Sequence, residues 1–526
     1  MSSQSYSQIR RGSDYPPSAS LSGEPHLELS RFITSFTPDL ELLVKQILDP
    51  KQPRLVITMG TEAADLDSMV TAITYSYWRH LNDLTKGTQA PAVYIPLINI
   101  PAADFKIRPE CVRVLEQTGR LDPKLLVFED SPVLASLFGR LRDNKSGPLV
   151  IPADRLEIIL VDHNKPNDYQ PFLAPYVRAI LDHHEDKQKF PEANPRWVTT
   201  VGSATTLTTL EGYQLLGGTG HTTAQASATN PTALDGFLPD LVRHQPNLFH
   251  MLLAPILVDT GNLDPNNGQL APMDQEAIDV LWRARPRLET MLPSQPPRNS
   301  DEVYDLAAEG KPFPIALPTE CQSNSIGETD EACRTAYLSA WFHDIDTARK
   351  NVIHLTGAEL LRKDYKSWTM GPYNVGISAV IMSFKQWIGR DSTPVFEQSI
   401  HQTYLDRKVD LFAVMTMYSD EHDPTQLRRE LLVYAPELRL SDATINDPKH
   451  QHFRKLLEDL NAAPELNLEP YRPTNNRKCF ASLIDADSPY SQTLDTKGYV
   501  VYNQRNIKSS RKKMQPLMTK SLSQAN

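Results

Sequence analysis

Aspartate and histidine residues stand directly behind several apolar runs of this chain. The segment RAILDHHEDK places Asp182, His183 and His184 after one such run, although only 14 of the 526 residues are histidine. Three further runs, in VITMGTEAADLDSMV, ILVDHN and ILVDTGN, end in similar polar clusters that contain Asp65, Asp67, Asp162, His163, Asp259 and Asn262. Aspartates that converge in space repel one another unless cations lie between them, so this pattern indicates a metal site.

The residue types indicate which metals and which chemistry. Carboxylate oxygens with one or two imidazole nitrogens suit Mg²⁺ or Mn²⁺, and such a set also accepts Co²⁺. The candidate ligands are numerous enough for two ions that share a bridging carboxylate. Paired ions of this kind lie about 3.5–4 Å apart and generate a hydroxide that hydrolyses phosphoryl groups.

Each motif also has a plainer interpretation. A single aspartate behind a strand is most often the N-cap of the next helix, and DLDS could cap the helix that begins in SMVTAITYSYW. The triplet DHH by itself is ordinary surface polarity. Four motifs that each close an apolar run favour the metal site over these interpretations.

The apolar runs predict the elements that position these residues. Seven runs have the continuous apolar character of buried strands in a parallel sheet: residues 54–60, 92–100, 124–130, 156–164, 177–184, 196–203 and 253–262. Segments of helical composition alternate with them, and residues 27–48 predict an opening helix with a break at Pro38. This alternation predicts an α/β domain with a doubly wound, mainly parallel sheet, whose strand carboxyl ends form the ligand-binding edge.

A smaller α+β domain is expected after a segment rich in proline and polar residues. Its expected elements are a helix over 333–350 and strands over 375–384, 410–419 and 429–436. We expect the active site in the cleft between the two domains. The expected organisation is a disordered tail (1–27), a metal-binding domain (28–295) with a flexible insertion (about 216–236), a linker (296–335), a C-terminal domain (336–516) and a tail (517–526).

Bulk composition limits the partners. The net charge of −10 argues against broad binding to nucleic acid or to membrane surfaces, although a local basic pocket can still hold an anion. The sequence has no apolar run long enough to span a membrane and no signal peptide, and its four cysteines are scattered. We therefore expect a cytoplasmic protein; its oligomeric state is not predicted.

The ordered set DLDS, VDHN, LDHH and VDTGN resembles the motifs of the DHH phosphoesterase superfamily. The later segments LLRKDYKSW and SSRKKMQP resemble the two signatures of the C-terminal domain of family II inorganic pyrophosphatases, eukaryotic exopolyphosphatases and prune-like proteins. The opening MGTEAADLDS is closer to the exopolyphosphatase and prune form than to the pyrophosphatase form.

The resemblance implies two divalent ions and a set of residues that bind them: Asp65, Asp67, Asp162, His183 and Asp259. Asp65 would bind the first ion, Asp162 would bridge both ions, and the other three would bind the second. His184 would contact the phosphate or the leaving oxygen. The resemblance further implies orienting groups (His163, Asp182, Asn262) and basic groups that grip the phosphate chain (Lys366, Arg511, Lys512).

The sequence departs from the family pattern at Thr61, where pyrophosphatases have a histidine that binds the first metal. A hydroxyl is a poorer ligand than an imidazole. The function implied is hydrolysis of phosphoanhydrides, foremost the release of terminal phosphate from inorganic polyphosphate. The alternatives are an inorganic pyrophosphatase, a prune-like phosphodiesterase for cyclic nucleotides or short polyphosphates, and a weakly active regulatory binding protein. The expected partner is a small phosphoanhydride, without membrane or nucleic acid.

Overall fold

The computed structural model describes residues 28–35, 40–87, 92–142, 150–167, 169–216, 237–267, 269–286, 331–420, 423, 426–436, 447–471 and 498–523. The expected N-terminal tail, most of the expected insertion (217–236) and most of the expected linker (296–330) lie outside these residues. The chain forms two compact units, Met1–Arg349 and Lys350–Asn526. Helix α11 (Glu331–Lys350) therefore falls almost wholly in the first unit, although part of its span was expected to open the C-terminal domain.

A six-stranded sheet forms the centre of the first unit. Its order is β3-β2-β1-β4-β5-β6 and every neighbouring pair is parallel. The strands are β1 (Arg54–Met59), β2 (Ala92–Ile98), β3 (Val127–Phe128), β4 (Leu156–Val161), β5 (Val177–Asp182) and β6 (Arg196–Val198). Both faces of β1 and β4 are buried, which explains why these strands read as unbroken apolar runs. The predicted doubly wound parallel sheet is confirmed.

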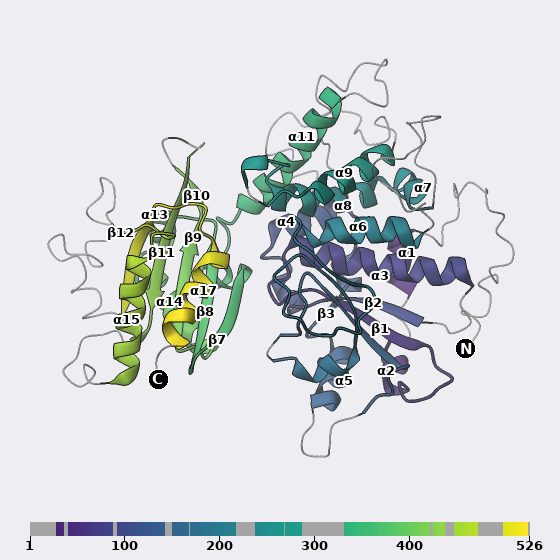
Figure 1. Cartoon of the computed structure of the whole chain (residues 1–526), viewed down its shortest axis with the longest axis horizontal. Helices are drawn as coiled ribbons and strands as arrows, with labels where there is room; N and C mark the ends of the chain where they lie inside the picture. The colour runs from purple at the N-terminus through teal and green to yellow at the C-terminus, as the bar shows by residue number, and fades with distance from the viewer. Residues whose placement is uncertain are drawn as a thin grey trace. The chain divides into compact units, whose positions relative to one another are not determined.

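Helices cover both faces of this sheet. Figure 1 shows α3, α6 and α8 on one side and α2 and α5 on the other. The helices of the first unit are α1 (Leu29–Ser35), α2 (Leu40–Lys45), α3 (Leu66–Lys86), α4 (Pro109–Cys111), α5 (Pro132–Arg142), α6 (Ala204–Leu215), α7 (Phe237–His244), α8 (Pro246–Thr260), α9 (Pro272–Arg283) and α11. Short turns of helix are η2 (Ala102–Asp104), η3 (Val112–Thr118), η4 (Pro123–Leu125), η5 (Pro171–Tyr176) and η6 (Pro265–Asn267).

The strand predicted over residues 253–262 is wrong, because this run belongs to helix α8. The helix begins with Pro246 at its first turn and ends at Gly261, which has a φ of 61° and donates its amide to the carbonyls of the last turn. Proline at the start and left-handed glycine after the end are helix signals. The apolar run is buried from Leu248 to Leu257, and the period of such a run does not separate a buried helix from a buried strand.

The second unit is built on a mixed seven-stranded sheet. Its order is β12-β13-β11-β9-β8-β7, with β10 paired to β11, and only β8 and β9 are parallel among the described pairs. The strands are β7 (Tyr365–Met370), β8 (Tyr373–Val380), β9 (Leu411–Thr416), β10 (Tyr418–Ser419), β11 (Leu427–Tyr434), β12 (Leu468–Pro470) and β13 (Tyr499–Gln504). The three strands predicted here correspond to β8, β9 with β10, and β11. The mixed sheet confirms the predicted α+β class.

The helices of the second unit are α12 (Gly357–Lys363), α13 (Phe384–Asp391), α14 (Thr393–Asp406), α15 (Pro448–Ala462) and α17 (Arg511–Ser523). Helix α17 runs beyond residue 516, where the sequence predicted a tail. Its Met514, Met518 and Leu522 recur every four residues and are buried in one core with the strands and α15. Packing of this apolar stripe explains why the helix continues.

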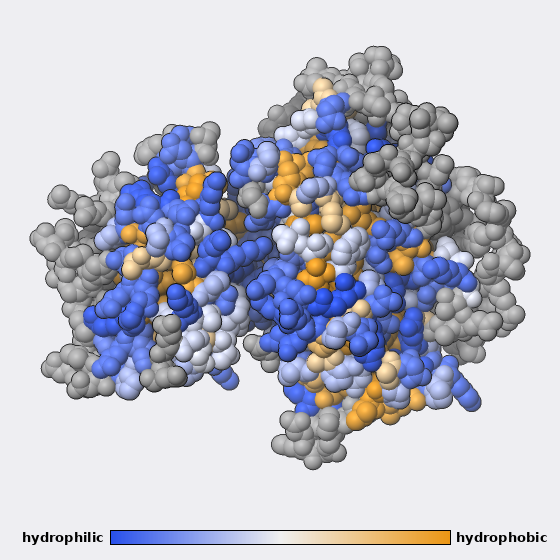
Figure 2. All heavy atoms as spheres, viewed as in Figure 1, coloured by the Kyte–Doolittle hydropathy of each residue, from blue (hydrophilic) through white to orange (hydrophobic). Residues whose placement is uncertain are grey.

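The described helices include none long and apolar enough to cross a membrane. On the face shown in Figure 2, hydrophilic residues cover much of each unit, and apolar residues form smaller groups between them.

Candidate metal centre

The site residues of the first unit lie at the point where the strand order reverses. Strands β1 and β4 are neighbours, and the chain leaves them toward opposite edges of the sheet. Ligands of open α/β sheets bind at the carboxyl ends of strands at such a switch point. The segment after β1 carries Asp65 and Asp67, and Asp162 follows β4 directly.

Asp162 is the centre of the cluster. It is 2% exposed and has a φ of 62°, a left-handed conformation that is uncommon for a residue other than glycine. Its Oδ1 lies 3.1 Å from His183 Nε2 and 3.5 Å from His184 Nδ1, and its Oδ2 accepts a hydrogen bond from the Ser68 hydroxyl. The two oxygens of this carboxylate therefore face different neighbours.

His183 presents its Nε2 to the carboxylates. Its Nδ1 donates to the carbonyl of Val201 at 3.0 Å, and Nε2 lies 3.9 Å from Asp67 Oδ2. Burial lowers the pKa of His183, but the hydrogen bond with Asp162 and the charges of Asp162, Asp67 and Asp259 outweigh it and raise the pKa to about 10. A ring held through Nδ1–H with Nε2 directed at carboxylates has the arrangement of a metal-binding histidine.

Asp67 is held by the first turn of α6. Its carboxylate accepts hydrogen bonds from the Ser203 hydroxyl (2.6 Å), the Ala204 amide (2.7 Å), and the amide and hydroxyl of Thr205 (2.9 and 2.7 Å). The positive end of a helix stabilises an anion placed there. These contacts fix Asp67, and they occupy amides that would otherwise be available to a phosphate.

Asp259 stands in the last turn of α8 rather than at a strand end. Burial and the charges of Asp67 and Asp65 raise its pKa well above the usual range, with Asp162 contributing in the same direction and His183 opposing it. The carboxylates are thus close enough to repel one another. Asn262 follows Gly261 with a φ of 63° and donates its amide to the Leu257 carbonyl at 2.7 Å, which ends the helix.

These donors fit a divalent cation. Asp162, His183 and His184 can each offer one ligand atom within 4.8 Å of the others, and Asp67 Oδ2 lies nearby. Carboxylate oxygens with imidazole nitrogen suit Mn²⁺ and Mg²⁺. Burial and neighbouring carboxylates raise the pKa of Asp259, and the hydrogen bond and charges of neighbouring carboxylates raise that of His183.

His184 points differently from His183. Its Nδ1 donates to Asp182 Oδ1 at 2.9 Å and its backbone amide donates to the same oxygen at 3.1 Å. Asp182 is fully buried, whereas the His184 side chain is 32% exposed. Burial raises the pKa of Asp182, but its hydrogen bonds with His184 and the charge of that ring bring it below the usual range. The Asn164 side-chain amide holds the other oxygen of Asp182.

His163, expected to orient ligands, donates from Nδ1 to the Val161 carbonyl at 2.8 Å. Its Nε2 is buried without a hydrogen-bond partner among the described residues. Burial lowers the pKa of His163, so the ring is uncharged at neutral pH. Its hydrogen bond is thus to its own strand end, and the charges of Asp182 and Asp162 also act on the ring.

Thr61 contacts Ser68. Among the described residues, no hydrogen bond joins Thr61 to a carboxylate oxygen. Its hydroxyl is 2.9 Å from Ser68 Oγ, and its amide donates to the same atom at 3.3 Å. Asp65, which follows, is exposed and caps α3 by accepting the Ser68 amide at 3.0 Å. Asp65 thus combines the capping role considered from the sequence with a place near the cluster.

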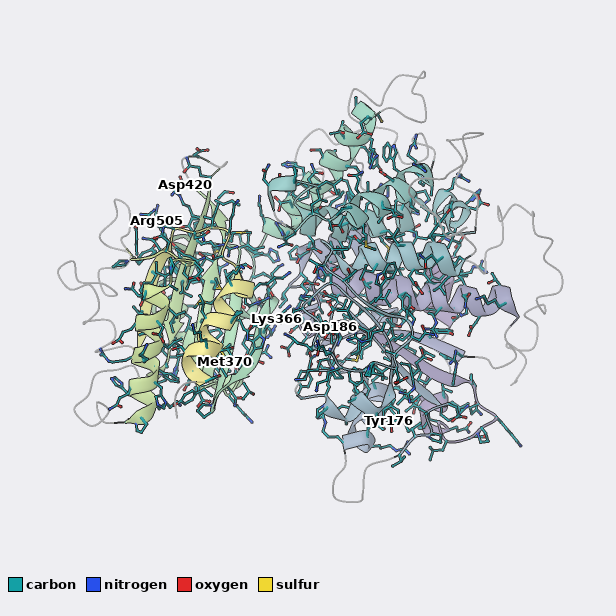
Figure 3. All side chains as sticks on the ribbon, viewed as in Figure 1. Tyr176, Asp186, Lys366, Met370, Asp420 and Arg505 are labelled. Atoms are coloured by element: carbon teal, nitrogen blue, oxygen red, sulfur yellow. The ribbon has the colours of Figure 1, made fainter. Side chains whose placement is uncertain are left out.

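The basic residues predicted in the second unit centre on Asp364. Arg511, the first residue of α17, donates to Asp364 Oδ1 at 2.6 Å and to the Asp364 carbonyl at 2.9 Å. Burial raises the pKa of Asp364, but the charges of Arg511, Lys366 and Lys363 lower it overall. Lys366 lies on β7, an edge strand (Figure 3), and Lys512 follows Arg511 in α17. Lys363, Lys366 and Arg511 thus act together on the Asp364 carboxylate.

Sequence reasoning missed several residues that hold the predicted ones in place: Ser68, Asn164, Thr205, Lys363 and Asp364. Four of them stand inside quoted motifs, in DLDS, VDHN and LLRKDYKSW. The signal was therefore present, but the sequence does not reveal which neighbour each side chain contacts.

Comparisons with known proteins show what the chain as a whole is similar to. Residues 343–521 match the model of the DHHA2 domain. Exopolyphosphatase PRUNE1 of Mus musculus is 24% identical over 473 residues, which cover 89% of this chain and 76% of the relative. The human protein of that name is 23% identical over 469 residues, with the same shares. Over most of its length the chain is thus similar to prune-like proteins.

A structural likeness is more distant. The crystal structure of a Methanococcus jannaschii protein assigned to the family II inorganic pyrophosphatases superposes with a TM-score of 0.44 and 16% identity, covering 89% of this chain and 99% of that one.

Proposed function

We propose that this protein is a metal-dependent hydrolase of phosphoanhydride bonds, and that it releases terminal phosphate from inorganic polyphosphate. The observation that carries the proposal is the cluster around Asp162, in which His183 Nε2 lies 3.1 Å from one carboxylate oxygen and 3.9 Å from Asp67. Relatives that are named exopolyphosphatase match this chain over 76% of their own length, and they support the choice of polyphosphate.

Two divalent ions, Mn²⁺ or Mg²⁺, would be held by a set of carboxylates and one imidazole: Asp65, Asp67, Asp162, His183 and Asp259. Such ions, when bound, polarise phosphoryl oxygens and lower the pKa of water so that hydroxide is available at neutral pH. The protein contributes by fixing these side chains. Asp67 is held by the α6 turn, and His183 is held by the Val201 carbonyl.

His184 supplies a proton to the leaving phosphate oxygen. Asp182 takes the hydrogen bond from Nδ1, so that Nε2 is the ring nitrogen left for the substrate. A carboxylate behind a histidine fixes the ring orientation and stabilises its protonated form. We assign this pair the role of a general acid.

Basic groups of the second unit bind the phosphate chain. Arginine contacts phosphate oxygens in pairs, and lysine acts as a point charge. We assign this role to Lys366, Arg511 and Lys512. Asp364 restrains Arg511 while leaving the cluster with a net positive charge, since three cations, Lys363, Lys366 and Arg511, face this one carboxylate.

The test is phosphate release by the purified chain. With Mn²⁺ or Mg²⁺ present, long-chain polyphosphate should yield orthophosphate, and an Asp162→Ala variant should yield none. Pyrophosphate and a cyclic nucleotide assayed under the same conditions decide between the alternatives. Absence of release from all three substrates by a folded protein, verified by circular dichroism, would leave only the regulatory binding protein.

A further inference from the structure

The hydroxyl of Ser68 lies between two residues of the candidate centre. Ser68 is 1% exposed; its hydroxyl donates to Asp162 Oδ2 and is 2.9 Å from the hydroxyl of Thr61. The Thr61 amide also points at Ser68 Oγ, at 3.3 Å. Thr61 is itself buried, so its hydroxyl is committed to this contact rather than to solvent. The result is a chain of contacts from Thr61 through Ser68 to Asp162.

The two oxygens of Asp162 consequently have unequal surroundings. Oδ1 faces His183 Nε2, and beyond it Asp67, whose position the first turn of α6 fixes through four hydrogen bonds. Oδ2 faces the two hydroxyls. A carboxylate that bridges two ions must give one oxygen to each, so the two ions would meet very different partners.

The ligands on the Oδ1 side are fixed and charged. His183 and Asp67 are both buried in the cluster, and the charge of Asp259 adds to the attraction for a cation. On the Oδ2 side, the described contacts are with two neutral hydroxyls; Asp65, the remaining proposed ligand, is exposed and caps α3. Preorganised anionic ligands bind a hard cation far better than neutral hydroxyls that must first break their own hydrogen bonds.

We infer that the free protein holds one divalent ion tightly and takes up the second only together with a phosphate chain. Ser68 and Thr61 set this inequality. Phosphate oxygens complete the coordination of the weaker ion, as they do where Mg²⁺ is bound by one or two carboxylates plus substrate phosphates. The inference rests on the proposed function for the identity of the anion, and it makes the metal–phosphate complex the true substrate.

The experiment is a titration of the purified chain with Mn²⁺, in which electron paramagnetic resonance measures free Mn²⁺. One ion should bind tightly and a second about 10- to 100-fold more weakly, which is the usual effect of a poorly supported ligand set. Methylenediphosphonate, which resists hydrolysis, should then raise the affinity for the second ion to a level comparable with that of the first.

Variants connect this behaviour to the hydroxyl chain. Thr61→His adds an imidazole and should give two tight ions without the phosphonate. Ser68→Ala removes the donor to Asp162 Oδ2 and should narrow the difference between the two affinities. Thr58→Val is the matched control, because Thr58 is a fully buried threonine of β1 whose hydroxyl has no hydrogen-bond partner among the described residues. Its titration should match that of the unaltered chain.

Two outcomes overturn the inference. The free protein could bind two ions with equal affinity, or methylenediphosphonate could leave the affinity for the second ion unchanged. Failure of the proposed function gives a different result. A chain that binds one ion tightly and gains the second with phosphonate, yet releases no phosphate from polyphosphate, loses the proposed activity and keeps the inference. A chain that hydrolyses polyphosphate and binds two equal ions keeps the activity and loses the inference.

Discussion

His184 Nδ1 lies 2.9 Å from Asp182 Oδ1, and Asp182 is fully buried behind the ring. The same aspartate accepts the His184 amide, and Asn164 holds its second oxygen. This arrangement fixes the ring through Asp182, although Asp162 Oδ1 also lies 3.5 Å from Nδ1. In the proposed mechanism the two adjacent histidines have different roles, His183 toward a metal ion and His184 toward the substrate.

Replacing Asp182 by asparagine should therefore reduce turnover without loss of metal. The asparagine side chain no longer favours the protonated ring, and we expect kcat for polyphosphate to fall about 100-fold. Binding of the tight Mn²⁺ ion should change little, and KM should change less than kcat. Asp186→Asn is the control, because Asp186 is exposed and pairs with Arg196 (Figure 3). Loss of Mn²⁺ in the Asp182 variant would contradict the separation of roles.

Asp259 should make the stability of the chelated protein depend on pH. Its folded pKa is raised by burial and by the charges of Asp67 and Asp65. A raised carboxyl pKa means that the stability contributed by the protonated group is complete below the unfolded pKa near 4 and is lost as pH rises toward the folded pKa. In EDTA, the free energy of unfolding should fall over that window, and Asp259→Asn should flatten the fall.

In EDTA at neutral pH, the Asp259→Asn variant should be more stable than the unaltered chain. Saturating Mn²⁺ should reverse this order of stability. The unaltered chain gains stability from binding that the Asp259→Asn variant loses in part. Chemical unfolding with and without EDTA measures both effects. An Asp259→Asn variant less stable than the unaltered chain in EDTA at neutral pH would contradict carboxylate repulsion in this cluster.

Glu430 should make the stability of the second unit depend on pH. Glu430 is 1% exposed, and burial raises its pKa to about 7 despite hydrogen bonds from the Phe384 amide and the Tyr418 hydroxyl. The stability it contributes is complete below pH 4.5 and is lost between pH 4.5 and about 7, by about 3 kcal/mol at most. Glu430→Gln should remove this dependence in urea unfolding, whereas Glu458→Gln, at an exposed position, should not.

Lys366 should act on substrate affinity. We expect Lys366→Met to raise KM for polyphosphate about tenfold, because one lost phosphate contact weakens binding by about 1.4 kcal/mol. The salt dependence of KM should also become shallower, since fewer charges are paired with the chain. Lys408→Met changes an exposed lysine of the same unit and should leave both quantities as they were. Equal effects of the two substitutions would indicate general charge rather than a site.

Much of the fold follows from local pattern. Six of the seven predicted strands form the parallel sheet, because β1 and β4 are buried on both faces and must be apolar throughout. The exception, residues 253–262, is equally apolar. Pro246, Gly261 and the length of the run identify it as helix α8, and weighing them would have corrected the prediction.

The convergence of Asp67, Asp162 and His183 follows from the direction of parallel strands, since their carboxyl ends meet at one edge. The contacts that orient them do not follow. Nothing local in DLDS says that Ser68 contacts Asp162, or that Asp67 accepts hydrogen bonds from α6, which begins at Ala204. Likewise, a basic signature does not reveal that Arg511 is paired with Asp364. These are tertiary contacts between distant segments.

The left-handed end of α8 has a consequence for when the candidate metal centre forms during folding. Asp259 lies in the last turn of α8, just before the helix ends at Gly261, and the other proposed ligands come from segments after β1, β4 and β5. Such distant contacts form late, after the chain between them has become ordered. The proposed ligand set spans residues 65 to 259, so a fragment that ends before Asp259 does not contain all of it. Uptake of the tight ion should therefore report the completion of folding, and a chain released before Asp259 is synthesised should lack the full set.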